Sequence, residues 1–233
     1  MIEIFLKETF PRHYGIDSDM VNVPIERTQR PFTKVDDKAC NDAANIRYNE
    51  EGVFNKHRDV CLACDKVVLK VDNNGHEITI VDFEKYINSL PNNQITENRC
   101  DLIMTDGVPH NKIVFCDLCC YEEKYIGPNS GQHPEGKRAY ARKQMEKSIE
   151  MLLSVNVLNQ YILTYPEKEC LFAYRSYNAI QQPVKAQRRN VEDNMQAMMV
   201  TPSSVSGRIV TENNVMNHNF TFVQNKYPAV YNW

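Results

Sequence analysis

A nearly continuous apolar run in the middle of the chain limits the available folds more than any other feature. The run KIVFCDL at residues 112–118 predicts a central strand covered on both faces, because few of its side chains suit water. A shorter apolar run, LIM at 102–104, precedes it, and the turn-rich TDGVPHN lies between the two. The two runs together predict a β-hairpin.

The segment after this hairpin predicts the clearest helix of the chain. Between residues 136 and 161, apolar side chains recur every three or four positions, and Lys, Arg and Glu fill the opposite side; the apolar positions are Ala141, Met145, Ile149, Leu152 and Leu153. A strand is expected at CLFAYRS, residues 170–176, and another helix at residues 184–200. Hairpins followed by helix, strand and helix predict an α/β fold, in which a central mixed β-sheet is flanked by helices.

The rest of the chain is organised around this core. Val67, Leu69 and Val71 alternate against Lys66 and Lys70, and Ile78 and Ile80 follow after Asn73-Asn74-Gly75, which predicts another hairpin. Residues 1–38 contain three prolines and predict an irregular N-terminal arm. Residues 201–233 predict a β-prone tail with a late strand. We therefore expect one core domain at 39–200 between an arm and a tail.

Composition excludes several classes of protein. No stretch approaches the roughly 18 consecutive apolar residues of a transmembrane helix, and the first residues do not resemble a signal peptide. The expected compartment is therefore cytoplasmic, where the eight cysteines stay reduced. A net charge of -3 argues against a protein that coats nucleic acid, although a local basic face stays open.

Two aspartates are the first candidates for chemistry. Asp101 begins one strand of the central hairpin, and Asp117 lies within the other. Two carboxylates that converge at one end of a sheet form an oxygen site suited to Mg²⁺ or Mn²⁺. The alternative is that each is an ordinary residue at a strand edge or a turn.

The run ENRCDLIM, the turn, KIVFCDLCC and a helix with KQMEKSIEML resemble the core of the PD-(D/E)xK nuclease superfamily, the fold of many restriction and repair endonucleases. The resemblance covers about residues 98–178. It implies a restriction-endonuclease-like core and a metal-dependent nuclease that acts on DNA or RNA, in bacterial or phage defence. Asp101 matches the first family Asp, Asp117 the second acidic position, and Gln144 the Gln that some members carry on the following helix.

The chain departs from the family at one position. Where the family has Lys two residues after the second acid, this chain has Cys119, and a neutral thiol cannot act as an ammonium does. In one interpretation Lys124 supplies the cation and Glu123 assists. In the other, the site is inactive and the fold persists as a module that binds nucleic acid or a partner protein.

Cysteine spacing leaves a zinc-stabilised structural protein as a further alternative. Cys61-x-x-Cys64 and Cys116-x-x-Cys119 have the spacing of zinc ligands. Cys116 and Cys119 fall in an expected strand, however, and should point to opposite faces of it. Buried free thiols are the competing interpretation.

A basic helix entry offers a surface for nucleic acid. Its cations could face phosphates together with those of a later segment; they are Lys137, Arg138, Arg142, Lys143, Arg188 and Arg189. The competing interpretation is a solvated helix face with paired charges. A homodimer or an operon-encoded protein partner is also compatible with the sequence, through the arm or the tail.

Overall fold

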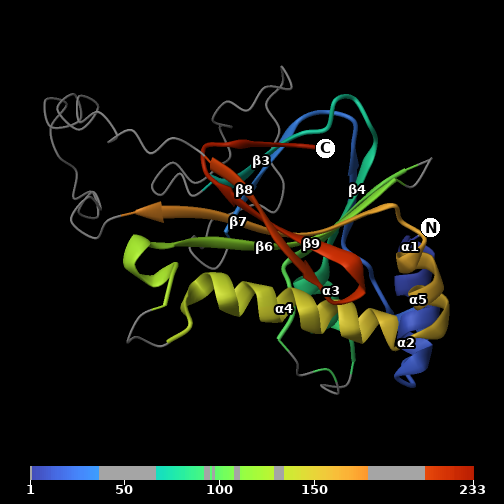
Figure 1. Ribbon diagram of the computed structural model, residues 1–233. Helices are drawn as coiled ribbons and strands as arrows, with labels where there is room; N and C mark the ends of the chain where they lie inside the picture. Colours follow the sequence, from blue (N-terminus) through green and yellow to red (C-terminus); the bar gives the residue numbers. More distant parts are fainter. Residues whose placement is uncertain are drawn as a thin grey trace, which may run out of the picture.

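The computed structural model describes residues 2–36, 67–91, 95, 98–107, 111–128, 134–177 and 208–233. It is an α/β structure with two β-sheets and helices on one side (Figure 1). The main sheet has seven strands in the order β1-β4-β5-β6-β7-β9-β8, and the smaller sheet has three in the order β10-β3-β2. The expected α/β class with a mixed central sheet is confirmed.

The main sheet is antiparallel at its edges and parallel in the middle. Its strands are β1 (Ile25–Thr28), β4 (Ile78–Asp82), β5 (Leu102–Asp106), β6 (Lys112–Glu122), β7 (Glu167–Tyr177), β8 (Arg208–Met216) and β9 (Phe220–Lys226). Strands β4, β5 and β6 form an antiparallel meander, and β6, β7 and β9 run parallel. The expected hairpin of β5 and β6 and the strand β7 are confirmed, and β6 is central.

Helices cover one face of this sheet (Figure 1). They are α4 (Gly136–Leu153), α5 (Asn156–Leu163), α3 (Phe83–Ser89) and a helical run at the N-terminus, made of α1 (Ile2–Ile4), the π-helical turn η1 (Phe5–Thr9) and α2 (Phe10–His13). Short 3₁₀ turns are η2 (Ser18–Met20), η4 (Glu123–Tyr125) and η6 (Asn217–Asn219). The expected helix at 136–161 is interrupted, because Val155 is extended and starts a new helix.

The smaller sheet covers the other face of the main sheet. It contains β2 (Phe32–Val35), β3 (Val67–Asp72) and β10 (Val230–Asn232). Leu69 and Val71 of β3 pack against Ile78 and Ile80 of β4 in the core between the sheets. The strands expected at 67–71 and 78–80 and their turn are present, but the hairpin is wrong. Strand β3 pairs with β2 and β10, whereas β4 pairs with β1 and β5, so the turn joins two layers.

Both ends of the chain complete the sheets. The first 36 residues form helices and two strands where the sequence predicts an irregular arm, and Ile2, Leu6 and Phe10 are buried in the core under the helices. In the tail, β9 lies inside the main sheet and β10 inside the smaller one. The expected late strand is therefore present.

The remaining points concern one helix expected from the sequence and the suitability of the described helices for crossing a membrane. The helix expected at 184–200 lies outside the described residues. Among the residues that are described, we find no helix with the length and apolar content needed to cross a membrane.

Candidate functional site

The structure brings Asp101 and Asp117 together. Strand β5 pairs with β6 up to Leu102, which lies opposite Cys116, so the paired ladder ends one residue before Asp101 and Asp117. The Asp101 Oδ2 atom accepts a hydrogen bond of 2.7 Å from the backbone N–H of Leu118. Burial raises the pKa of the Cys100 and Cys116 thiols and both carboxylates raise it further, so the two acids lie in one region at the end of the β5–β6 ladder.

Asp36 accepts a hydrogen bond at the same edge of β6 as Asp101. Alternate amides of a strand point to the same edge, and β6 continues beyond the end of β5. The Leu118 amide is bonded to Asp101, and the Cys120 amide donates a 2.8 Å hydrogen bond to Asp36 Oδ2. Asp36 follows β2, so the smaller sheet delivers an acid to the same open edge. The carboxylates of Asp101 and Asp36 therefore accept hydrogen bonds from the two amides of β6 with which a longer β5 strand would have paired.

Helix α4 fixes the chain just before Asp101. Gln144 Nε2 donates a 2.9 Å hydrogen bond to the carbonyl oxygen of Arg99, and the N–H of Cys100 donates one of 2.8 Å to Ser148 Oγ. Gln144 and Ser148 lie one helical turn apart, and both are buried. The structure thus places Gln144 behind the strand entry, where it positions the backbone of Asp101.

The two faces of β6 differ. Phe115 and Cys119 belong to the core under the helices, whereas Cys116 belongs to the core between the sheets. Since side chains alternate along a strand, Asp117 lies on the α4 side, where it is 7% exposed. The expectation that Cys116 and Cys119 point to opposite faces is confirmed, so the two thiols cannot coordinate one zinc ion together. Cys61 and Cys64 lie outside the described residues.

Lys34 is a buried cation that sequence reasoning missed. It lies in β2 and is 2% exposed. Burial raises the pKa of the Cys116 thiol, the Asp101 and Asp117 carboxylates raise it further, and the Lys34 ammonium lowers it. The Lys34 charge is therefore felt at the same thiol as the two acids, and it offsets theirs. No local signal marks this residue, because its strand falls in the expected irregular arm.

The structure does not bring Glu123 and Lys124 to the carboxylates. Both lie in η4, after β6 has run five residues, about 17 Å, beyond Asp117. Burial raises the pKa of the Glu123 carboxyl, but hydrogen bonds from Ser176 and Lys226 and the Lys226 charge outweigh it, and the net pKa is lowered. The Lys226 Nζ atom is 3.2 Å from Glu123. Lys124 lies over the ring of Tyr125, with 4.7 Å from Nζ to the ring centroid.

Lys137 provides a cation on the same face as Asp117. Its Nζ atom is 4.3 Å from the ring centroid of Tyr121, which follows Cys119 by two residues on β6. Burial and the Asp117 and Asp36 carboxylates raise the pKa of the Cys119 thiol, and the Lys137 ammonium lowers it. The charge of Lys137 therefore acts at the position where the family has its Lys.

A glycine contact places Lys137 there. Gly136 has a φ of +84°, and a Cβ atom at this position would lie 2.3 Å from the backbone of Gly127. The amide of Arg138 donates a 3.1 Å hydrogen bond to the carbonyl of Ile126. The start of α4 is thereby packed against the turn after η4, which brings its first turn beside the end of β6.

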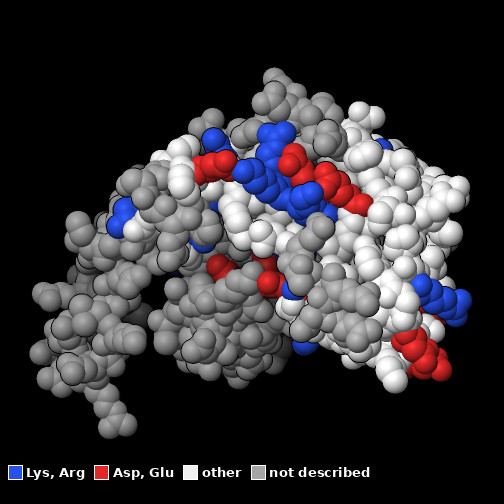
Figure 2. Space-filling view, turned by 90° about the horizontal axis from the view of Figure 1, so that it is seen from below, with Lys and Arg blue, Asp and Glu red and all other residues white. Residues whose placement is uncertain are grey.

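Charges on the exposed face of α4 are largely paired. Figure 2 views the molecule from the α4 side and shows basic and acidic side chains interspersed in one band. Arg142 Nε is 3.4 Å from Glu146, Lys147 Nζ is 2.8 Å from Glu150, and Lys143 pairs with Glu135. This pattern favours the paired-charge interpretation of the helix face. Arg188 and Arg189 lie outside the described residues.

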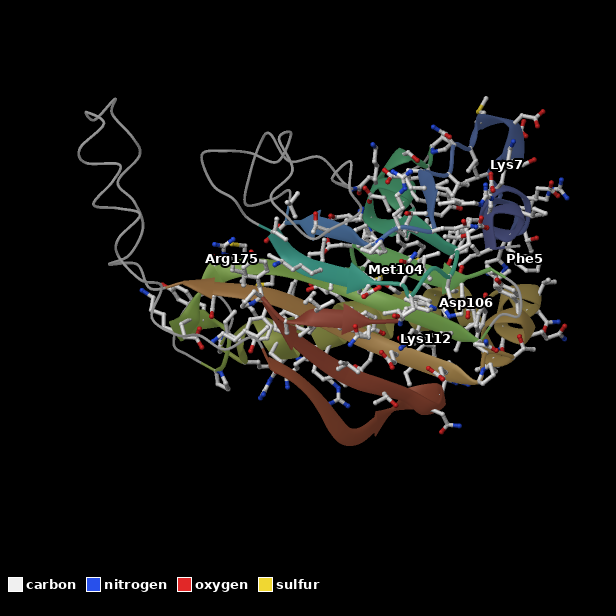
Figure 3. All side chains as sticks on the ribbon, turned by 90° about the horizontal axis from the view of Figure 1, so that it is seen from above. Phe5, Lys7, Met104, Asp106, Lys112 and Arg175 are labelled. Atoms are coloured by element: carbon white, nitrogen blue, oxygen red, sulfur yellow. The ribbon has the colours of Figure 1, made fainter. Side chains whose placement is uncertain are left out.

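A separate charged cluster at the other end of the main sheet is structural. Figure 3 labels Asp106 and Lys112 near the turn of β5 and β6, and Arg175 at the opposite end. Lys112 Nζ is 3.0 Å from Glu169 and lies over the rings of Tyr231 and Trp233, while Tyr231 hydrogen bonds to Glu169. The cluster fastens the C-terminal strand onto the sheet.

Two further observations concern a nearby pocket and the number of possible metal ligands. A pocket of about 110 Å³ lies between the two sheets and α3; its lining residues are Pro24, Ile25, Glu26, Lys34, Ile80, Asp82 and Lys85. Over the described ranges, no group of three or more His, Cys, Asp or Glu side chains is placed to hold a metal ion. Any ion at the site would therefore depend on two carboxylates, with water and substrate completing its shell.

No protein-family model, curated protein or solved structure matches this chain. The resemblance to the PD-(D/E)xK nucleases therefore rests on the residues and motifs of the sequence alone.

Proposed function

We propose that the protein is a metal-dependent nuclease with a restriction-endonuclease-like core. The observation that carries this proposal is that Asp101 and Asp117 lie in one region where β5 ends, with Asp101 bonded to the amide of Leu118, the residue after Asp117. Its context supports it: an antiparallel meander of β4, β5 and β6, a crossover through α4, and a parallel strand β7. Gln144 packs behind the first acid, as the resemblance implies.

The two carboxylates suit Mg²⁺ or Mn²⁺. Mg²⁺ commonly takes one or two protein carboxylates and completes its shell with water and phosphate oxygens, so a third acidic ligand is not needed. When bound, the ion would lower the pKa of a water molecule and stabilise negative charge on a phosphodiester. The hydrogen bond from the Leu118 amide holds the Asp101 carboxylate at the end of β5.

Lys137 is our proposed replacement for the family Lys. It shares a face of β6 with Asp117, and its charge acts at Cys119. A lysine side chain has a flexible four-carbon stem, so the ammonium could swing from the Tyr121 ring to a phosphate. Lys34 lies in β2 of the smaller sheet, and its charge opposes that of the acids at the Cys116 thiol.

The direct test is divalent-ion dependence. The purified protein is expected to cut DNA or RNA with Mg²⁺ or Mn²⁺ and to stop when the ion is chelated. Calorimetric titration with Mn²⁺ should show binding that is roughly tenfold or more weaker in Asp117→Asn. Glu150→Gln, which removes an acid paired with Lys147 on the exposed face of α4, is the matched control and should bind normally. Cutting that persists in EDTA would refute the proposal.

The choice between the two lysines has its own prediction. Lys137→Met should slow cleavage by roughly tenfold or more, since it removes the cation that we propose stabilises the reacting phosphate. Lys124→Met should leave cleavage within about twofold when substrate is saturating, because Lys124 lies beyond the end of β6. Rates measured under saturating substrate separate turnover from binding. A larger loss of cleavage in Lys124→Met than in Lys137→Met would favour Lys124 as the replacement for the family Lys.

A non-catalytic module is the second candidate. Asp117 is buried, and Cys119 stands where the family has its Lys. Such a module would bind nucleic acid equally well with Mg²⁺ and with EDTA, and Asp117→Asn would leave that binding unchanged. Absence of cleavage together with metal-independent binding would therefore select this function over the first.

A further inference from the structure

Tyrosine and lysine side chains gather where β6 passes the start of α4. Tyr121 and Tyr125 lie edge to face with ring centroids 5.5 Å apart. Lys137 lies over the first ring and Lys124 over the second. Figure 1 shows this end of β6, and the turn that follows it, beside the start of α4. We call these four residues the tyrosine–lysine patch.

The patch is accessible in part. Lys124 is exposed, and the two tyrosines and Lys137 are half-buried. The adjacent acid, Glu123, is paired with Lys226 at 3.2 Å, which reduces its repulsion of an approaching anion. Lys226 in turn lies 6.0 Å from the ring centroid of Tyr174 on β7, so the aromatic and basic character continues across the sheet.

We infer that the tyrosine–lysine patch binds single-stranded nucleic acid and guides it to Asp117. Proteins that bind single strands combine cations for the backbone with aromatic rings on which bases stack. In the free protein the lysines rest on the tyrosine rings, and such an exposed contact is weak. When a strand arrives, the ammonium groups turn to phosphates and the rings become available to bases. A duplex keeps its bases stacked inside and gains less from the rings.

The position of the patch fits this role. Tyr121 lies four residues beyond Asp117 on the same face of β6, which is about 13 Å along the strand. A strand held at the patch would therefore lie close to the proposed metal ligands. This inference rests on the proposed function for its connection to cleavage, but the binding itself does not require a metal.

Binding in EDTA tests the inference separately from catalysis. Fluorescence anisotropy of short labelled single strands of DNA and of RNA, and of the matching duplex, gives the affinities. We expect the protein to prefer the single strand, and Tyr125→Ala to weaken its binding roughly five- to a hundredfold, the range found for loss of a stacked base. Lys124→Glu, at an exposed position that cannot disturb the core, should weaken binding and reduce its salt dependence.

The control variants lie on α4, outside the patch. Tyr140→Ala and Lys143→Ala should bind the single strand normally, since Lys143 is already paired with Glu135. Equal affinity for strand and duplex, or normal binding by both patch variants, would overturn the inference. Loss of single-strand binding in Tyr140→Ala and Lys143→Ala, with normal binding by the patch variants, would also overturn the inference. Asp101→Asn should bind normally, so a failure of the nuclease proposal and a failure of the patch give different results.

Discussion

The Asp101→Asn variant is expected to fold like the wild-type protein and to lose metal-dependent cleavage by roughly 10²- to 10³-fold. The fold should survive because an Asn side-chain oxygen can still accept the hydrogen bond from the Leu118 amide. The proposed metal ion would lose a charged ligand, since the neutral amide replaces a carboxylate. Single-turnover cleavage assays with Mg²⁺, beside circular dichroism of the same samples, measure both effects.

Asp36→Asn is a matched control for this substitution. Asp36 accepts a hydrogen bond from the Cys120 amide, two residues along the same edge of β6. The change in charge and shape is identical, but Asp36 does not lie opposite Asp117. Cleavage by Asp36→Asn should stay close to wild type. Equal losses in both variants would show that cleavage responds to the net charge of the edge, and would contradict a specific role for Asp101.

Alkaline pH is expected to destabilise the protein steeply above about pH 9. Four buried thiols have pKa values raised above their ordinary value near 9.0, chiefly because burial penalises the thiolate; they are Cys100, Cys116, Cys119 and Cys170. Above pH 9 the unfolded chain releases these protons while the folded protein keeps them. Their contribution is therefore fully present below pH 9 and is lost as pH rises.

The size of this effect follows from linkage. Well above the unfolded pKa, each thiol contributes about 1.4 kcal/mol per pH unit to the decrease in unfolding free energy, so four thiols give about 5 kcal/mol per pH unit. Urea unfolding under reducing conditions between pH 8 and about pH 10 measures the slope. Cys100→Ala removes one titrating group and should reduce the slope by about a quarter. A flat pH profile in this range would contradict the burial of these thiols.

The basic residues at the start of α4 have different surroundings, which their residue types alone do not reveal. Its sequence offers a basic helix entry, yet Arg142, Lys143 and Lys147 each meet an acid in the structure. Lys137, in the same stretch, instead lies over Tyr121 and acts at Cys119. The packing of Gly136 on Gly127 places Lys137 beside the end of β6.

Local signals in the sequence determined the central elements. The apolar runs and the turn between them gave β5 and β6, periodic apolar residues gave α4, and Asn73-Asn74-Gly75 gave a turn. The opposite faces of Cys116 and Cys119 also followed from the two-residue period of a strand. These features depend on neighbours in the chain, so periodicity and turn chemistry were sufficient to predict them.

The tertiary structure alone decided how distant segments meet. Strands β3 and β4 enter different sheets because their apolar faces pack against each other across the core, which no local pattern encodes. Asp36 reaches the Cys120 amide across 84 residues of sequence, and Lys34 joins the same region from β2. The candidate site therefore has a pair of acids that the sequence could locate. Its cations and its open strand edge arise from long-range packing, which depends on the shape of the whole core.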